Sequence, residues 1–168
     1  MATGATIRPA CAADLEAING IYNYYVSRST CTYQEEAEWP ASRWQWFKKH
    51  DDRHPIIVAE ENGGVIGWGS LSPYHPRSAY RFTVENSIYV HHAHHRRGIG
   101  SLLLAELISC ARRAGHRAII AAIDAEQAGS IRLHARQGFA EVGRFRQVGF
   151  KFNRWLDVVY MELLLPAV

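Results

Sequence analysis

The sequence predicts one mixed α/β domain that spans residues 1–168. Three local patterns support this. Residues 55–74 contain two apolar runs joined by Glu-Asn-Gly-Gly, which is a hairpin signal. Residues 99–114 form an amphipathic helix pattern that starts within a Gly-x-Gly sequence, residues 98–100. Residues 117–124 (RAIIAAID) are a continuous apolar run, as expected for a strand that is buried on both faces.

The other elements follow from local signals. Residues 14–26 carry apolar side chains at helical spacing after a possible cap, Asp14, and Pro40 suits the first turn of a second helix. Gly115 is placed to end the helix over 99–114. We expect further strands over 5–10, 81–90, 139–145 and 155–165, and a last helix over 128–137. The resulting order is βααβββαβαββ, without an internal repeat or linker.

Composition restricts the functional classes. Hydrophobic residues make up 48% of the chain and charged residues 21%, which is typical of a globular domain. The net charge of +3 does not call for a nucleic-acid partner, and no apolar run reaches the ~20 residues of a membrane helix. The three cysteines, Cys11, Cys31 and Cys110, suggest neither a disulfide framework nor a zinc ribbon. We therefore expect a cytoplasmic protein with no membrane or nucleic-acid partner.

The segment YVHHAHHRRGIGS (89–101) is the most unusual part of the chain. Neighbouring histidines in an extended segment point to opposite sides, so the four histidines are not expected to converge on one ion, and we expect no metal. Gly98 and Gly100 precede a helix, and glycines let backbone N–H groups approach an anion at a helix N-terminus. Arg96 and Arg97 add charge. The alternative is an ordinary tight turn.

Several segments together resemble the GNAT superfamily of acetyl-CoA-dependent N-acetyltransferases: ENSIYV, HRRGIGSLLL, AIIAAID and SIRLHARQGF, in this order and spacing. IRPA, IYNYYV, YRFTVENSIYV, LHARQGF and KFNRWLDVVYMEL resemble its phosphinothricin and methionine sulfoximine acetyltransferase branch. Members of that branch acetylate the α-amino group of small amino-acid-like compounds. The resemblance extends over nearly the whole chain.

The resemblance implies a GNAT-type acyltransferase fold, with a central, mostly antiparallel sheet whose middle strands splay apart and helices on its flanks. It also implies acetyl-CoA as co-substrate and a homodimer. The pantetheine arm would lie in the gap against the backbone of residues 88–90, and the loop of residues 96–101 would hold the pyrophosphate. The implied cofactor residues are Ile88, Tyr89, Val90, Arg96, Arg97, Gly98, Ile99, Gly100, Ser101, Gln127 and Ser130.

Two positions depart from the family pattern. His95 stands where the family's loop usually begins with Gln or Arg, and Gln127 stands where its next helix usually starts with Asn. Both side chains keep the ability to form hydrogen bonds. We therefore expect the two departures to change only the strength of cofactor binding.

Two residues are candidates for the chemistry. An amine attacks only when it is neutral, so a base must remove its proton near neutral pH, and Glu85 is the candidate. The alternative for Glu85 is a structural ion pair. His134 stands where many superfamily members have tyrosine, and it would protonate the leaving thiolate or help to deprotonate the amine. A histidine that only packs on a helix face is the alternative.

The resemblance also places the acceptor. Arg77 and Tyr80 would contact its acid group, because a guanidinium fits a carboxylate or phosphinate with paired hydrogen bonds, and Glu85, Asn86 and Ser87 would complete the substrate-binding residues. Arg77 would otherwise be a solvated loop residue. Three other functions stay open: a protein N-terminal acetyltransferase, a polyamine acetyltransferase, and a non-catalytic module that binds acetyl-CoA. A P-loop enzyme is disfavoured because GIGSLLL lacks the lysine.

Overall fold

Seven strands form one mixed sheet in the computed structural model, which describes residues 4–166. The strand order across the sheet is β1-β2-β3-β4-β5-β7-β6. The strands are β1 (Thr6–Pro9), β2 (Ile56–Glu61), β3 (Gly64–Pro73), β4 (Thr83–Val90), β5 (Ala118–Asp124), β6 (Ala140–Lys151) and β7 (Arg154–Leu164). All pairs are antiparallel except β4 with β5. The predicted fold class is confirmed, and so is the order of its elements.

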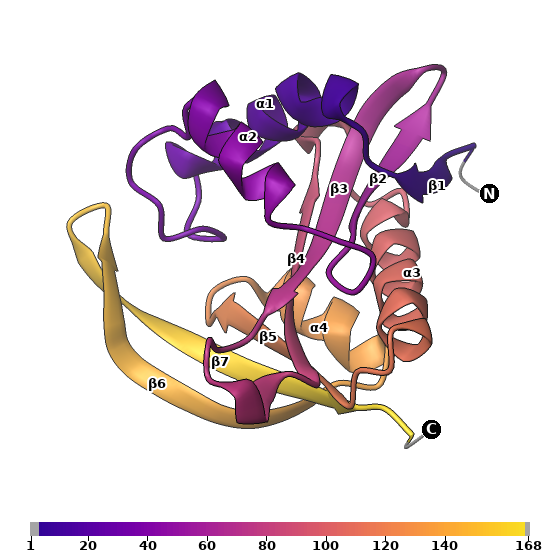
Figure 1. Ribbon diagram of the computed structural model, residues 1–168. Coiled ribbons are helices and arrows are strands. Elements are labelled where there is room, and N and C mark those ends of the chain that lie inside the picture. Colours follow the sequence, from indigo (N-terminus) through magenta and orange to yellow (C-terminus); the bar gives the residue numbers. More distant parts are fainter. Residues whose placement is uncertain (1–3, 167–168) are drawn as a thin grey trace.

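Helices cover both faces of the sheet (Figure 1). The helices α1 (Leu15–Val26) and α2 (Pro40–Lys48) lie over one face, and α3 (Ile99–Arg113) and α4 (Ala128–Arg136) lie over the other. Short 3₁₀ segments, which the sequence did not predict, occur at Ala12–Asp14, Ser78–Tyr80 and His92–His94. No helix within residues 4–166 is both long and apolar enough to span a membrane.

Two apolar clusters hold the helices to the sheet. Leu103, Leu104 and Leu107 of α3 are fully buried against β2–β5, and burial of each leucine stabilises the fold by roughly 1.5–3 kcal/mol. Ile18 and Ile21 of α1 belong to the second cluster, which lies against β2 and β3. The two clusters lie on opposite sides of the sheet, which we call its α3 face and its α1 face.

The last hairpin is longer than predicted. Strand β6 continues to Lys151, whereas apolar alternation in the sequence ends near residue 145. The β6–β7 register shifts between Phe145 and Gly149, and Gln147 in this interval has a φ of 55°. This irregularity interrupts the alternation that would have revealed the second half of the strand.

Candidate active site

A gap opens in the middle of the sheet. The parallel ladder between β4 and β5 contains only the pairs Thr83 with Ala118, Val84 with Ile119, and Glu85 with Ile120. Beyond Glu85, β4 continues along β3 while β5 continues along β7, so the two middle strands separate. This is the splayed arrangement that the resemblance implied, and Figure 1 shows β4 and β5 diverging.

The pleat of β4 sends its side chains alternately to the two sides of the gap. Val84 and Ile88 pack in the cluster under α3, and Asn86 lies between them in this alternation. Tyr89 packs in the cluster under α1, so Glu85 and Ser87 share that opposite face. The structure therefore brings Glu85 and Ser87 to the α1 face and places Asn86 on the α3 face.

The backbone of β4 also alternates. The amide of Leu71 donates to the carbonyl oxygen of Pro55, the residue before β2, so its register partner Asn86 directs its own N–H and C=O away from β3 and toward the gap. By the same alternation Ile88 and Val90 present their backbone groups to the gap, whereas those of Tyr89 face β3. Among the three predicted backbone residues, Tyr89 is thus the one turned away from the gap.

Glu85 is half-buried at the point where the strands part, and no hydrogen bond from its carboxylate to any of residues 4–166 is present. Burial raises the pKa of this carboxyl group. Burial also raises the pKa of the Tyr160 hydroxyl, and the negative charge of Glu85 adds to that shift. An ion pair with an arginine, the structural alternative for Glu85, is not found in this part of the chain.

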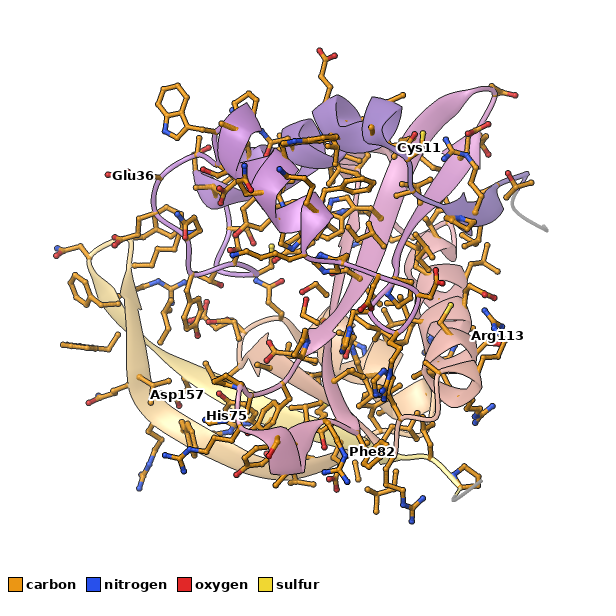
Figure 2. The ribbon with its side chains drawn as sticks, viewed as in Figure 1. Cys11, Glu36, His75, Phe82, Arg113 and Asp157 are labelled. Carbon is orange, nitrogen blue, oxygen red and sulfur yellow. The ribbon has the colours of Figure 1, made fainter. Side chains whose placement is uncertain are left out.

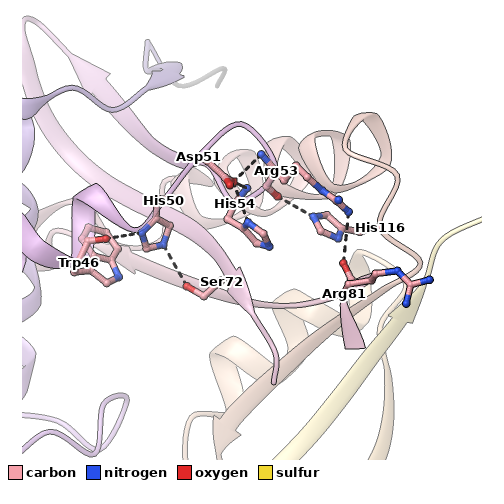
Figure 3. A network of polar contacts seen from close by, with 8 residues as sticks. All are labelled: Trp46, His50, Asp51, Arg53, His54, Ser72, Arg81 and His116. Carbon is pink, nitrogen blue, oxygen red and sulfur yellow. Dashed lines mark hydrogen bonds and ion pairs between the residues drawn. The ribbon is translucent and has the colours of Figure 1, made fainter. Parts of the chain in front are cut away.

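The strand neighbour of Glu85 on β3, Ser72, takes part in a group of polar contacts in which Figure 3 also labels His50 and Trp46. Ser72 is the register partner of Glu85, and its Oγ lies 3.3 Å from His50 Nε2. The Nδ1 atom of His50 lies 2.8 Å from the carbonyl oxygen of Trp46, and burial lowers the pKa of the imidazole. His50 was not predicted, because its nearness to Glu85 arises only from strand pairing.

His134 is buried on α4, with only 3% of its surface exposed. Its Nε2 lies 3.0 Å from Asn86 Nδ2, and its Nδ1 lies 2.8 Å from the carbonyl oxygen of Ser130. Phe139 meets the ring edge-on with a centroid distance of 5.0 Å. Burial lowers the pKa of the imidazole. The structure therefore joins His134 to Asn86 and Ser130, on the face of the sheet opposite Glu85.

The loop before α3 has an unusual backbone. Arg96 has a φ of 60° and Gly98 a φ of 81°, both in the left-handed region, and α3 begins at Ile99. The first amide groups of a helix have no intrahelical acceptor and carry partial positive charge. A Cβ atom on Gly100 would lie 3.2 Å from Leu133, so a side chain there would crowd α4. A loop and helix start of this geometry are suited to an anion, as the sequence predicted.

The two arginines of this loop differ in their contacts. Arg97 donates hydrogen bonds of 2.6 Å to Glu61 Oε1 and of 2.6 Å to His94 Nδ1. This pairing lowers the pKa of Glu61. Arg96 is exposed, and no hydrogen bond from its guanidinium to residues 4–166 is present. Of the predicted pair, Arg96 is the one whose charge is available to a ligand.

Three other predicted cofactor residues lie along α3 and α4. Ser101 Oγ accepts a hydrogen bond of 3.0 Å from Gln137, and the carbonyl of Ser130 accepts from His134. Gln127 directly precedes α4, and its side chain donates to Thr30 Oγ1 over 3.2 Å. The longer side chain of glutamine, where the family usually has asparagine, thus reaches the loop between α1 and α2.

The predicted acceptor residues Arg77 and Tyr80 lie in the exposed segment between β3 and β4, where Figure 2 labels His75. The ring of Tyr80 packs against Tyr74 at 5.7 Å and against His75 at 4.8 Å between centroids. A groove of about 670 Å³ lies elsewhere, between the segment of residues 48–55 and α3.

Two further contacts near the site were not predicted. Tyr25 on α1 donates a hydrogen bond of 2.5 Å to the carbonyl oxygen of Val90 at the end of β4. Tyr33 donates to Asp124 Oδ2 over 2.8 Å and lies against Gly149. Both tyrosines contact residues more than 60 positions away in sequence, so no local pattern could have assigned them. Within residues 4–166 no group of three His, Cys, Asp or Glu side chains is arranged to hold a metal ion.

Known proteins are similar to this chain in sequence and in structure. The model of the acetyltransferase (GNAT) family matches residues 18–139. An L-methionine sulfoximine/L-methionine sulfone acetyltransferase of Salmonella typhimurium is 40% identical over 161 residues, covering 95% of this chain and 94% of that protein.

Two solved structures are also similar. A GNAT superfamily phosphinothricin acetyltransferase from Sinorhizobium meliloti, in complex with acetyl-CoA, has a TM-score of 0.91 and 38% identity, covering 97% of this chain and 89% of the other. A ribosomal-protein-alanine N-acetyltransferase from Brucella melitensis has a TM-score of 0.93 and 42% identity, covering 95% of this chain and 99% of the other. The family match extends over most of the chain and includes both sides of the gap: the chain belongs to the acetyltransferase (GNAT) family.

Proposed function

We propose that the protein is an acetyl-CoA-dependent N-acetyltransferase that transfers an acetyl group to the α-amino group of a small amino-acid-like acceptor: phosphinothricin, methionine sulfoximine or sulfone, or a related L-amino acid. One observation carries the proposal. The gap between β4 and β5 has the anion-binding start of α3 on one side and the half-buried carboxylate of Glu85 on the other. The named relatives support the same reaction and acceptor class.

Several features fit acetyl-CoA. The amide groups at Gly98, Ile99 and Gly100, with the exposed Arg96, suit its pyrophosphate. Arg97 donates a hydrogen bond to Glu61 and so ties the loop to β2. Ser101 lies in the first turn of α3. The backbone groups of Ile88 and Val90 line the gap, as a pantetheine arm requires. Gln127 and Ser130 lie at the start of α4, near the proposed thiol end.

The acetyl thioester supplies an activated carbonyl carbon, and the residues on the α1 face prepare the amine that attacks it. An α-amino group titrates near ~8 and must lose a proton before it can attack. Burial raises the pKa of Glu85 toward that of the amine, which makes its carboxylate a better proton acceptor near neutral pH. One proton of the α-ammonium group passes to Glu85, directly or through water. The neutral nitrogen then bonds to the carbonyl carbon and the carbon–sulfur bond breaks; the second nitrogen proton neutralises the departing thiolate, so coenzyme A leaves as the thiol.

The acceptor's acid group is assigned to the segment before β4. Arg77 offers paired donors to a carboxylate or phosphinate, and Tyr80 lies beside it. Ser87 shares the face of Glu85, so it suits contact with the acceptor. Asn86, which the resemblance also assigned to the acceptor, faces α3 and α4 instead. An acetylation assay with phosphinothricin, methionine sulfoximine and free L-amino acids tests the proposal, and no acetylation of any of them would contradict it.

A peptide N-terminus is the second candidate acceptor. The similar ribosomal-protein-alanine N-acetyltransferase structure favours it. The same assay therefore includes a peptide with an N-terminal alanine. A higher kcat/KM for the peptide than for any free amino acid would move the assignment to this class.

We further propose that the protein forms a homodimer in the cytoplasm. The β6–β7 hairpin exposes large apolar side chains, including Phe145 at 56%, Val148 at 53% and Trp155 at 61% exposure. Several large apolar side chains exposed on one hairpin are typical of a protein interface. The three cysteines are free thiols, as expected in a reducing compartment.

A further inference from the structure

Asn86 and His134 form a pair whose hydrogen-bonding roles follow from their neighbours. The carbonyl oxygen of Ser130, 2.8 Å from His134 Nδ1, can only accept, so Nδ1 carries the proton. Burial lowers the pKa of the imidazole, which leaves the ring neutral and Nε2 without a proton. Nε2 therefore accepts from Asn86 Nδ2, 3.0 Å away. Both nitrogens of the ring are thus engaged inside the protein.

This arrangement fixes the amide of Asn86. A rotation that exchanged its oxygen and nitrogen would direct Oδ1 at the lone pair of His134 Nε2, which is repulsive. The amide oxygen must then face away from His134. Asn86 is only 8% exposed, and its Oδ1 is a buried atom with no hydrogen-bond partner. A buried acceptor without a partner is costly and uncommon, so its presence points to a ligand donor.

The position of Asn86 identifies the ligand. Asn86 is the first residue of β4 beyond the last β4–β5 pair, and it lies on the α3 and α4 face. That side carries the loop for the pyrophosphate, whereas Glu85 lies on the acceptor side. A donor that reaches Oδ1 therefore belongs to the cofactor, whose pantetheine arm contains amide N–H groups.

We propose that Asn86 Oδ1 accepts a hydrogen bond from an amide N–H of the pantetheine arm and that His134 is a positioning residue that holds Asn86 for this contact. The proposal rests on the proposed use of acetyl-CoA. It replaces the role of proton donor for His134, because Nδ1–H is already committed to Ser130 and Nε2 carries no proton to give.

The first test measures binding of two probes by calorimetry. Acetyl-CoA carries the arm, and the nucleotide fragment of coenzyme A lacks it. Asn86→Leu and His134→Phe should each weaken acetyl-CoA binding about 3- to 10-fold, the range of one hydrogen bond, and leave binding of the nucleotide fragment unchanged. The double variant should lose no more than the larger single loss, because both substitutions remove one coupled contact.

His116→Phe is the matched control. His116 is 2% exposed and lies between α3 and β5, where Figure 3 labels it. One of its ring nitrogens is bonded to the carbonyl of Arg53, and the other has no partner within residues 4–166. This substitution should lower the melting temperature without changing the affinity for either probe. An equal loss of affinity in His116→Phe would show that the effect comes from stability alone and would overturn the proposal.

The second test uses the wild-type protein, so it does not depend on a variant that folds. In nitrogen-15 spectra near neutral pH, His134 should be protonated at Nδ1 and bare at Nε2, and it should titrate below the ordinary range of an imidazole. The Asn86 side-chain amide signals should shift with acetyl-CoA and not with the nucleotide fragment. A His134 that titrates in the ordinary range, or an Asn86 signal unaffected by acetyl-CoA, would overturn the proposal. A wild-type protein that binds no acetyl-CoA would instead contradict the proposed function itself.

Discussion

The hydroxyl oxygen of Tyr25 lies 2.6 Å from Nε2 of His95, which ties α1 to the loop that precedes α3. The same hydroxyl donates to the carbonyl oxygen of Val90, so one side chain holds both the end of β4 and the residue before Arg96. Arg96 has a positive φ, which costs a non-glycine residue roughly 1–2 kcal/mol. The contact between Tyr25 and His95 stabilises that conformation.

Replacement of Tyr25 by phenylalanine should therefore loosen the loop. We expect Tyr25→Phe to weaken acetyl-CoA binding several-fold and to lower the free energy of unfolding by about 1 kcal/mol, the net value of one hydrogen bond. Calorimetry and chemical denaturation measure the two effects. Tyr24→Phe is the control, because Tyr24 stacks on His92 through its ring and should tolerate loss of the hydroxyl. Equal affinities in the two variants would contradict the proposed role of Tyr25.

Removal of the base should slow the chemical step. Glu85→Gln keeps size and hydrogen-bonding capacity but removes basicity, so kcat should fall by about 10²- to 10⁴-fold while acetyl-CoA affinity changes little. In the wild type, kcat/KM should rise with pH as Glu85 ionises, and because burial raises its pKa, this limb should lie above the ordinary range of a carboxyl group. The pH–rate profile of the variant should lack this limb. A kcat of Glu85→Gln equal to that of the wild type would exclude Glu85 as the base.

The same variant should be more stable than the wild type at neutral pH. The folded state binds the Glu85 proton more tightly than the unfolded state does, so stability begins to fall as the pH rises through the unfolded-state pKa of about 4.3, and the loss is complete once the pH exceeds the raised folded-state pKa. Glutamine carries no such cost. Thermal melts should show a higher Tm for Glu85→Gln near pH 7, and the difference should disappear as the pH falls below about 4, where both states are protonated.

The loop glycine offers a test of the anion site. Gly98 has a φ of 81°, so Gly98→Val should destabilise the loop by about 1–2 kcal/mol and block approach to its amides, and acetyl-CoA binding should weaken well beyond the loss in stability. Gly20→Ala serves as the control, because Gly20 lies in α1 with open space at its Cβ position and should gain up to about 1 kcal/mol. Unchanged affinity in Gly98→Val would argue against the loop as the pyrophosphate site.

Because Gly149 lies against the ring of Tyr33, we expect stability to be sensitive to any side chain at position 149. A Cβ on Gly149 would lie within the van der Waals radius of the Tyr33 ring, so Gly149→Ala should displace Tyr33 from Asp124 and lower the Tm. Gly143→Ala on the same strand meets nothing within 4 Å and should have little effect. Combination with Tyr33→Leu should recover part of the loss from Gly149→Ala. If both alanine variants melt like the wild type, the packing argument fails.

The exposed hairpin tests the homodimer. Trp155 is 61% exposed and its ring contacts Phe150 at 5.0 Å, so Trp155→Lys should shift the protein from dimer to monomer in sedimentation velocity without lowering its unfolding cooperativity. Trp39 is 75% exposed on the segment before α2, and Trp39→Lys should leave the assembly unchanged. A monomeric wild type would contradict the proposal directly.

Local patterns predicted much of the fold because the elements carry their own signals. The 55–74 hairpin has its turn residues, and α3 has buried leucines at helical spacing with Gly115 after its end. The second half of β6 lacked such a signal, because the register shift around Gln147 breaks the alternation.

The site was only partly predictable. Glu85 and the Gly98 loop lie in recognisable segments, whereas the pairing of Arg97 with Glu61 joins residues 36 positions apart. Whether a loop arginine faces a ligand or a carboxylate depends on strand β2, which brings Glu61 to the loop. The partnership of Asn86 with His134 depends in the same way on the packing of α4 under the splayed strands.

The short parallel ladder between β4 and β5 also joins two halves of the sheet that come from different halves of the chain. Strands β1–β4 come from residues 6–90 and strands β5–β7 from residues 118–164, and each set pairs only with itself apart from three register pairs. The β2–β3 and β6–β7 hairpins form from nearby segments with little loop entropy, so we expect them to assemble early. We expect docking of the two halves, sealed by α3, to follow, and the seam where they meet is the place where, under the proposed function, the reactants are brought together.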